Sequence, residues 1–78
     1  MLKDLVTVMA KALVDNPDAV DVQEVDGENS SIISLRVAKE NQGQVIGKHG
    51  QNVQSMRTIL FAVADKHKKR AILEIIEQ

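Results

Sequence analysis

The stretch "NQGQVIGKHGQNVQ" (residues 41–54) holds three of the four glycines in this 78-residue chain. Two of them, Gly47 and Gly50, enclose Lys48 and His49 in a G-x-x-G pattern between two segments that read as helices. Glycine adopts backbone angles that other residues avoid, and its missing Cβ atom lets another backbone come close. We therefore predict a tight corner between two helices at this point of the chain.

Such a corner combines features that suit a phosphate group. The first N–H groups of the following helix have no partner within that helix, and they carry the positive end of its dipole. Lys48 adds a mobile ammonium group, and His49 adds a hydrogen-bond donor that gains charge as the pH falls. The pattern predicts a phosphodiester site that needs no metal ion and no cofactor. Two glycines at this spacing also occur at ordinary helix ends. The surrounding elements are therefore needed to distinguish a phosphate site from such a helix end.

The sequence before the corner predicts a helix and a β-hairpin. Apolar residues at three- and four-residue spacing indicate an amphipathic helix that ends near Val14, and Pro17 closes that segment. Alternating apolar residues predict strands over residues 20–25 and 32–37, joined by a turn at "DGENS" (residues 26–30). We expect these two strands to pair antiparallel.

Residues 40–47 can form one or two helical turns before the corner, and a helix of about four turns follows it from Asn52. One face of this helix carries Val53, Met56, Ile59, Leu60, Val63 and Ala64. The last segment, "AILEIIE" (residues 71–77), has the nearly continuous apolar character of a strand covered by helices. A helical crossover of about 30 residues permits parallel pairing with the strand at 32–37. The predicted fold is α+β in the order α-β-β-α-α-β, with three helices on one face of a three-stranded mixed sheet.

Composition and charge narrow the class of protein. The chain has no cysteine, 44% hydrophobic residues and charged residues within its N-terminal apolar segment, so we expect a single cytoplasmic domain over residues 1–78, without a membrane span, linker or tail. Residues 1–30 hold two basic and seven acidic residues, whereas residues 31–78 hold eight basic and four acidic ones, so their charges are −5 and +4. This asymmetry lets the second part face a polyanion. From charge alone, solvated acidic and basic surfaces are the simpler explanation.

These features together resemble the KH domain in its type II arrangement. The resemblance rests on the pattern "G-x-V-I-G-K-x-G" at residues 43–50 and on the element order over nearly the whole chain. The short length and the "LEII" at residues 73–76 are similar to small stand-alone bacterial KH proteins. KH domains hold about four nucleotides of a single strand. The resemblance therefore implies non-catalytic binding of single-stranded RNA, as part of a post-transcriptional regulator or an RNA chaperone complex.

The resemblance also assigns roles to individual residues. It implies that the backbone clamp consists of Gly47, Lys48, His49 and Gly50, and that the wall of an apolar groove includes Val45, Ile46 and Val53. Arg57, one turn beyond Val53, fits a phosphate or base contact and a solvated side chain equally well. Gln51 and Asn52 stand where the family often has a basic residue, which predicts weaker binding. Phe61 is the single aromatic residue, and we predict that it packs in the core, which leaves no stacking platform and poor sequence discrimination.

A second function is consistent with the same sequence. Three strands leave exposed edges, and Val45 with Ile46 would offer an apolar contact surface, so the chain could be an interaction module in which the corner is only structural. The resemblance supports both functions, because relatives form homodimers and associate with a larger RNA-binding partner protein.

Other sites have little support in the sequence. The acidic residues between 15 and 28 lack the spacing of a calcium-binding loop, and His49 and His67 belong to no catalytic or zinc motif. "GQVIGKHG" lacks the spacing and the hydroxyl residue of a nucleotide-binding P-loop. The basic residues Lys66, Lys68, Lys69 and Arg70 fit an extended phosphate track no better than a solvated helix end. We therefore predict neither an enzyme nor a metal site.

Overall fold

The structure, a computed structural model, describes residues 2–76 and has the element order predicted from the sequence. The elements are helix α1 (Leu2–Leu13), strands β1 (Asp21–Asp26) and β2 (Ser30–Arg36), the short helix α2 (Gln42–Ile46), the long helix α3 (Gln51–Lys66) and strand β3 (Arg70–Ile76). Single 3-10 turns lie at Pro17–Ala19, Lys39–Asn41 and Lys48–Gly50. Glu77, predicted as the end of the last strand, lies outside the described residues.

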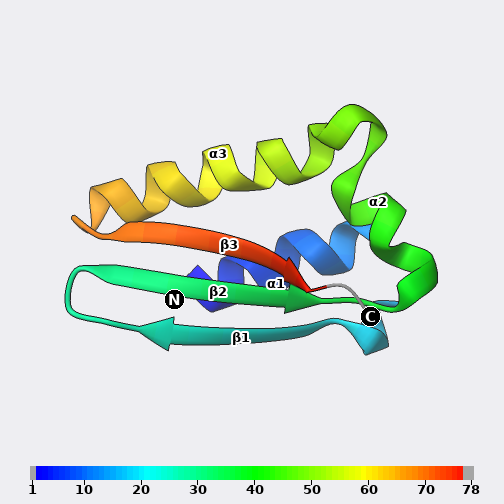
Figure 1. Cartoon of the computed structure of the whole chain (residues 1–78), viewed down its shortest axis with the longest axis horizontal. Helices are drawn as coiled ribbons and strands as arrows, with labels where there is room; N and C mark the ends of the chain where they lie inside the picture. The colour runs from blue at the N-terminus through cyan, green and yellow to red at the C-terminus, as the bar shows by residue number, and fades with distance from the viewer. Residues whose placement is uncertain (1, 77–78) are drawn as a thin grey trace.

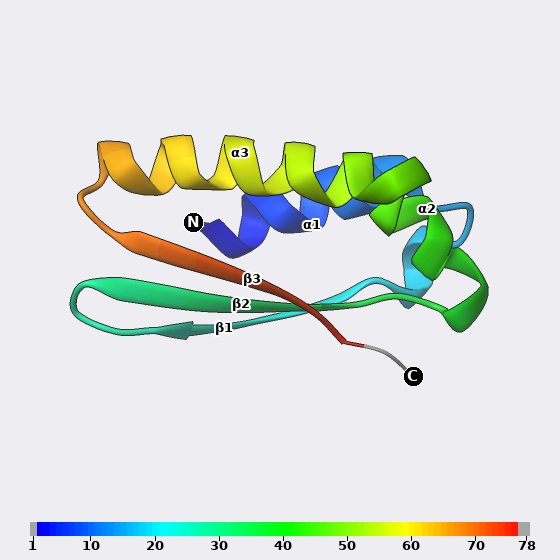
Figure 2. The ribbon, with the colours of Figure 1, turned by 45° about the horizontal axis from the view of Figure 1, so that its top comes forward.

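The three strands form one mixed sheet in the order β1-β2-β3 (Figure 1). β1 pairs antiparallel with β2, so that Val22 lies opposite Leu35. β3 pairs parallel with the other side of β2, so that Ile72 lies beside Ile32. Helices α1 and α3 cover one face of the sheet, and α2 lies at its end on the same side (Figure 2). The predicted α+β fold with a mixed sheet is therefore confirmed.

The core lies between the helices and the covered face of the sheet. Successive strand residues point to opposite faces, so alternate residues of β2, such as Ile33 and Leu35, face the helices and have no exposed surface. The helices present residues at three- and four-residue spacing to the same core. Its buried apolar side chains are Leu2, Val6, Ala10, Val14, Val22, Ile33, Leu35, Val37, Val45, Val53, Met56, Leu60, Ala64, Ala71 and Leu73.

Several apolar side chains expected in this core are exposed. Phe61 and Ile59 on α3 each leave 46% of their surface in solvent, so the prediction that Phe61 packs in the core is wrong. The buried stripe of α3 passes through Leu60, and each further residue turns about 100° around the helix axis, which moves Phe61 off that stripe. Ile72 on β3 is also exposed, because the helices cover only one face of the sheet.

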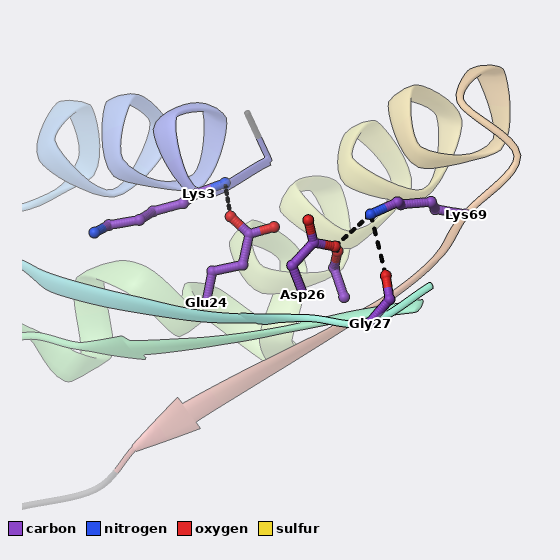
Figure 3. Close-up of polar contacts among 6 residues, drawn as sticks. Lys3, Glu24, Asp26, Gly27 and Lys69 are labelled. Atoms are coloured by element: carbon purple, nitrogen blue, oxygen red, sulfur yellow. Dashed lines mark hydrogen bonds and ion pairs between the residues drawn. The ribbon is translucent and has the colours of Figure 1, made fainter. Parts of the chain in front are cut away.

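Polar contacts fix the hairpin turn to the turn between α3 and β3 (Figure 3). The Lys69 ammonium forms an ion pair with Asp26 and donates a hydrogen bond to the Gly27 carbonyl at 3.3 Å. The buried Ser31 hydroxyl donates to the same Asp26 carboxylate at 2.7 Å. The hydrogen bond from Lys69, and then that from Ser31, lower the pKa of Asp26 below its ordinary value of 3.8. Two turns far apart in the sequence are thereby held together at one end of the molecule.

Candidate functional site

The glycine corner (residues 47–50) joins α2 to α3 through a run of positive φ angles. Gly47 has φ 77° and ψ 174°, and Gly50 has φ 75° and ψ 15°. His49, between them, has φ 57° and ψ 26°, a left-handed conformation that is uncommon for a residue with a side chain. Backbone of this kind persists only where the surroundings hold it, and it concentrates at functional sites. The predicted tight corner is confirmed.

The two glycines serve different purposes. A Cβ atom on Gly47 would lie 2.6 Å from Cγ and 2.8 Å from the backbone nitrogen of Asn52, so the fold itself requires glycine there. The Asn52 side chain is held in that place because its Nδ2 donates to the Gln44 carbonyl at 2.8 Å. A Cβ atom on Gly50 would meet only Val53 Cγ1, at 4.0 Å. Gly50 therefore presents open backbone surface to an approaching ligand.

Helix α3 begins at the corner without a side-chain cap. Gly50 is its N-cap residue, and no side chain makes a cap hydrogen bond there. The first N–H groups of this 16-residue helix therefore keep the positive partial charge of the helix N-terminus. Lys48 and His49 are exposed beside them, and residues 41–64 contain no aspartate or glutamate. The N–H groups of Gly50 and Gln51 donate to the carbonyls of Gly47 and Lys48 within the corner. The corner is thus a positively charged surface at the N-terminus of a long helix, a setting that favours a bound phosphate.

The residues predicted for the apolar groove wall lie in different environments. Val45 has no exposed surface, so the prediction that it contacts a ligand is corrected: it packs beneath the corner as part of the core. Ile46 is 38% exposed beside it. Val53 is largely buried, and its side chain lies next to Gly50. Ile46 is therefore the main apolar surface that α2 contributes beside the corner.

The side chain of Arg57 is partly buried and forms a hydrogen bond within the fold. Its Nη2 donates a hydrogen bond to the Leu73 carbonyl at 3.0 Å, and the residue is half-buried between α3 and β3. A guanidinium has five N–H donors, so this hydrogen bond leaves others for a ligand. Arg57 thus lies at the free edge of β3, between the glycine corner and the turn that joins α3 to β3.

Two hollows lie beside α3. The spacing of apolar residues in the sequence does not predict either of them. One, of about 260 Å³, lies between α1 and the start of α3 and is lined mainly by apolar side chains, including Met9, Leu13 and Met56. The other, of about 1130 Å³, lies at the opposite end of α3 and is lined by residues of the segments 29–30, 61–65 and 68–72. The position of Phe61 outside the buried stripe of α3 is the sequence signal that points to the larger hollow.

Two other kinds of site are absent from the described residues. Within residues 2–76, no helix is both long enough and apolar enough to cross a membrane. In the same part of the chain, no three His, Asp or Glu side chains lie close enough together to hold a metal ion.

A helix, a β-hairpin, a glycine corner between two helices and a parallel edge strand together form a type II KH domain. A family model described as "KhpA/KhpB, KH domain" matches residues 3–75. The chain belongs to this family, which confirms the KH resemblance and agrees with a non-enzymatic domain.

Similar proteins from several bacteria are each named RNA-binding protein KhpA. The protein from Caldanaerobacter subterraneus subsp. tengcongensis is 58% identical over 73 residues, which cover 94% of this chain and 97% of the relative. The Aquifex aeolicus protein is 50% identical over 76 residues, 97% of this chain and 96% of the relative. The Clostridium acetobutylicum protein is 49% identical over 75 residues, 96% of this chain and all of the relative. No solved structure matches the chain.

Proposed function

We propose that this chain binds single-stranded RNA by holding the sugar-phosphate backbone at the glycine corner. The observation that carries the proposal is the convergence, at one point, of the uncapped N-terminus of α3, the open Cα of Gly50 and the exposed side chains of Lys48 and His49. Relatives that match nearly the whole chain are named RNA-binding proteins, which supports the same function.

The contacts available at the corner define how the RNA would be held. The α3 amides and Lys48 bind phosphate oxygens, and Gly50 lets the backbone of the nucleic acid come close. Ile46 and Val53 provide apolar surface beside the loop, and Arg57 reaches a phosphate or a base edge. With two or three phosphate contacts, log K should fall with log salt by about 0.7 per contact, a shallow dependence. We also propose that this activity belongs to a post-transcriptional regulator or RNA chaperone complex.

The direct test reverses the charge at the corner. The double variant Lys48→Asp/His49→Asp should bind a six-nucleotide RNA at least about tenfold more weakly, because a charge-assisted phosphate contact contributes about 1.5 to 3 kcal/mol. Both side chains are exposed, so the thermal unfolding midpoint should change little. Fluorescence anisotropy titration measures the affinity, and circular dichroism measures the unfolding.

A matched control is available at the other end of α3. Lys66→Asp/His67→Asp changes the same two residue types, at exposed positions roughly 24 Å away along the helix. Charges at that distance are screened at physiological ionic strength, where the Debye length is about 8 Å. The control should bind the short RNA as wild type does. Equal affinity for the corner variant and wild type would contradict the clamp.

A second candidate function is association with another protein, either a second copy of the chain or a KhpB-like RNA-binding partner. The apolar hollow between α1 and α3 favours it, because the partly buried Met9 and the exposed Ile59 line a surface that protein contact would bury. The family model joins KhpA and KhpB under one KH domain, which is compatible with such a pair.

Sedimentation velocity tests self-association and its relation to RNA. A mass that rises with protein concentration, and that falls in an Ile59→Asp variant, is the expected result for a dimer that uses the hollow. A single monomeric species at every concentration contradicts self-association. Addition of the six-nucleotide RNA then shows whether the two functions compete for one surface.

A further inference from the structure

We propose that the larger hollow at the end of α3 is a second nucleotide-binding site, which extends the RNA path beyond the glycine corner. This inference rests on the proposed function. The hollow, called the distal groove below, is an open groove of about 1130 Å³ between α3, β3 and the hairpin turn. The hairpin turn and the α3–β3 turn lie at the opposite end of the molecule from the glycine corner (Figure 1). Its lining residues include the apolar Phe61, Ala62 and Ile72, the basic Lys68 and Arg70, and the acidic Asp65.

Phe61 gives the distal groove an aromatic surface. It is the only aromatic residue in the chain, and 46% of its surface is exposed although burial of a phenylalanine is strongly favourable. Ile72, which also lines the groove, is 44% exposed and lies on the face of β3 that the helices leave uncovered. Aromatic rings stack with bases of any sequence, because every base has a π face. The groove therefore supplies the stacking surface that the glycine corner lacks.

Basic side chains surround this apolar surface. Lys68 and Arg70 are exposed, whereas Lys69 is held by its ion pair with Asp26 (Figure 3). Asp65 is the one acidic residue of the lining, so the cations outnumber the acids in the groove. An apolar floor with a cationic rim complements a nucleotide, whose base is flat and apolar on its faces and whose phosphate is anionic.

The groove and the glycine corner lie along one side of α3. Val53, Arg57 and Phe61 are separated by four residues each, and residues at this spacing are neighbours on a helix surface. Val53 lies next to Gly50, and Arg57 reaches the β3 edge midway between the corner and the groove. A strand of RNA leaving the corner along this side meets a cation and then an aromatic ring.

An extended peptide is the main competing occupant, because β3 is an edge strand to which another strand could pair. The structure favours RNA over a peptide for two reasons. Arg57 already occupies the Leu73 carbonyl in the middle of that edge, so an added strand would have to displace it. The cationic rim also matches a polyanion better than a neutral backbone.

The test compares RNA length in the full chain. Wild type and variants are titrated with single-stranded RNAs of four and twelve nucleotides by fluorescence anisotropy. Phe61→Leu keeps the apolar bulk and removes the ring, so it should weaken binding of the longer RNA about fivefold or more and leave the shorter RNA unaffected. Lys68→Gln/Arg70→Gln should make the salt slope for the longer RNA shallower by about 0.7 for each phosphate that these two cations neutralise in wild type.

Two variants serve as controls. Val8→Ala removes exposed apolar surface from α1, and Lys66→Gln removes a charge close to the groove from a residue that does not line it. Neither should change the length dependence, and thermal unfolding shows that every variant is folded.

The outcomes separate this inference from the proposed function. If wild type binds neither RNA, the proposed function fails and the distal groove fails with it. If the corner variant loses both RNAs while the groove variants bind the longer one as wild type does, RNA binding stands and the distal groove is refuted. An equal loss for both lengths in Phe61→Leu would also refute a separate second site.

Discussion

The two ends of α3 carry similar residues in opposite electrostatic settings. Lys48 and His49 precede the helix, and His67 and Lys68 follow it. His49 has φ 57° and Lys68 has φ 58°, so each end also contains a left-handed residue with a side chain. At the start of α3 the cation adds to the positive end of the helix dipole, whereas at the end the cations offset its negative end. Similar side chains thus add to a positive potential at one end of α3 and offset a negative one at the other.

Acidic side chains near the far end of α3 increase this electrostatic difference between the two ends of the helix. Residues 41–64 contain no acidic side chain, whereas Asp65 and Asp26 lie at the far end and Asp26 binds Lys69 directly. The corner therefore keeps its positive potential, and the far end is partly neutralised. Because of this difference in helix polarity and neighbouring acids, we propose the glycine corner, and not the far end of α3, as the primary phosphate site.

The largest effect on the free energy of unfolding is expected from substitution of a glycine at the corner. Gly47→Ala should cost about 3 kcal/mol or more of unfolding free energy, because the Cβ atom would collide with Asn52 and the backbone lies in a region nearly restricted to glycine. Gly50→Ala should cost only about 1 to 2 kcal/mol, the penalty of a left-handed alanine, because space is open around it. Urea denaturation measures both values.

RNA binding should distinguish the two glycines in a second way, because Gly50 matters less for stability but lies on the proposed binding surface. Gly50→Ala stays folded and places a methyl group on the surface proposed for the phosphodiester, so it should weaken binding of a short RNA. Equal stability for the two alanine variants would show that the glycines are interchangeable in the corner. Unchanged RNA affinity in Gly50→Ala would show that its open surface has no part in binding.

The element order of this fold can be predicted from the sequence because the signals are local. In β2, Ile33 and Leu35 alternate with polar residues over the whole strand, and the covered face of the sheet follows directly. The apolar stripe of α3 runs for four turns, which fixes the face of Leu60. The corner is equally local, since only glycine adopts the angles found at Gly47 without strain.

The details of the candidate site depend on tertiary packing and could not be predicted in the same way. Helix α2 has only five residues, too few for a periodic pattern to show that Val45 faces the core and Ile46 the solvent. Phe61 follows the buried Leu60 directly, so a rotation of one residue about the helix axis decides its exposure. The hydrogen bond from Arg57 to the Leu73 carbonyl joins elements whose relative position no local pattern specifies.

The smallest effect is expected at the far end of α3, where pH tests the tie between Asp26 and Lys69. The hydrogen bonds from Lys69 and Ser31 lower the pKa of Asp26 in the folded chain, so the tie stabilises the fold above the ordinary value of 3.8 and is lost as the pH falls through the lowered pKa. Asp26→Asn should therefore have a slightly lower unfolding midpoint than wild type at pH 7, and the difference should vanish in stronger acid.

Lys69→Gln is the matched variant, because it keeps the carboxylate and removes its cation. Circular dichroism measures the thermal unfolding midpoint at each pH. In Lys69→Gln this midpoint should change less than in wild type as the pH falls through the lowered pKa of Asp26. If wild type and both variants instead give parallel profiles from pH 7 into acid, the two turns are not held together by this ion pair in solution. The cations Lys68 and Arg70 would then lack a fixed position, and the contrast between an open corner and a partly neutralised far end would rest on the helix dipole alone.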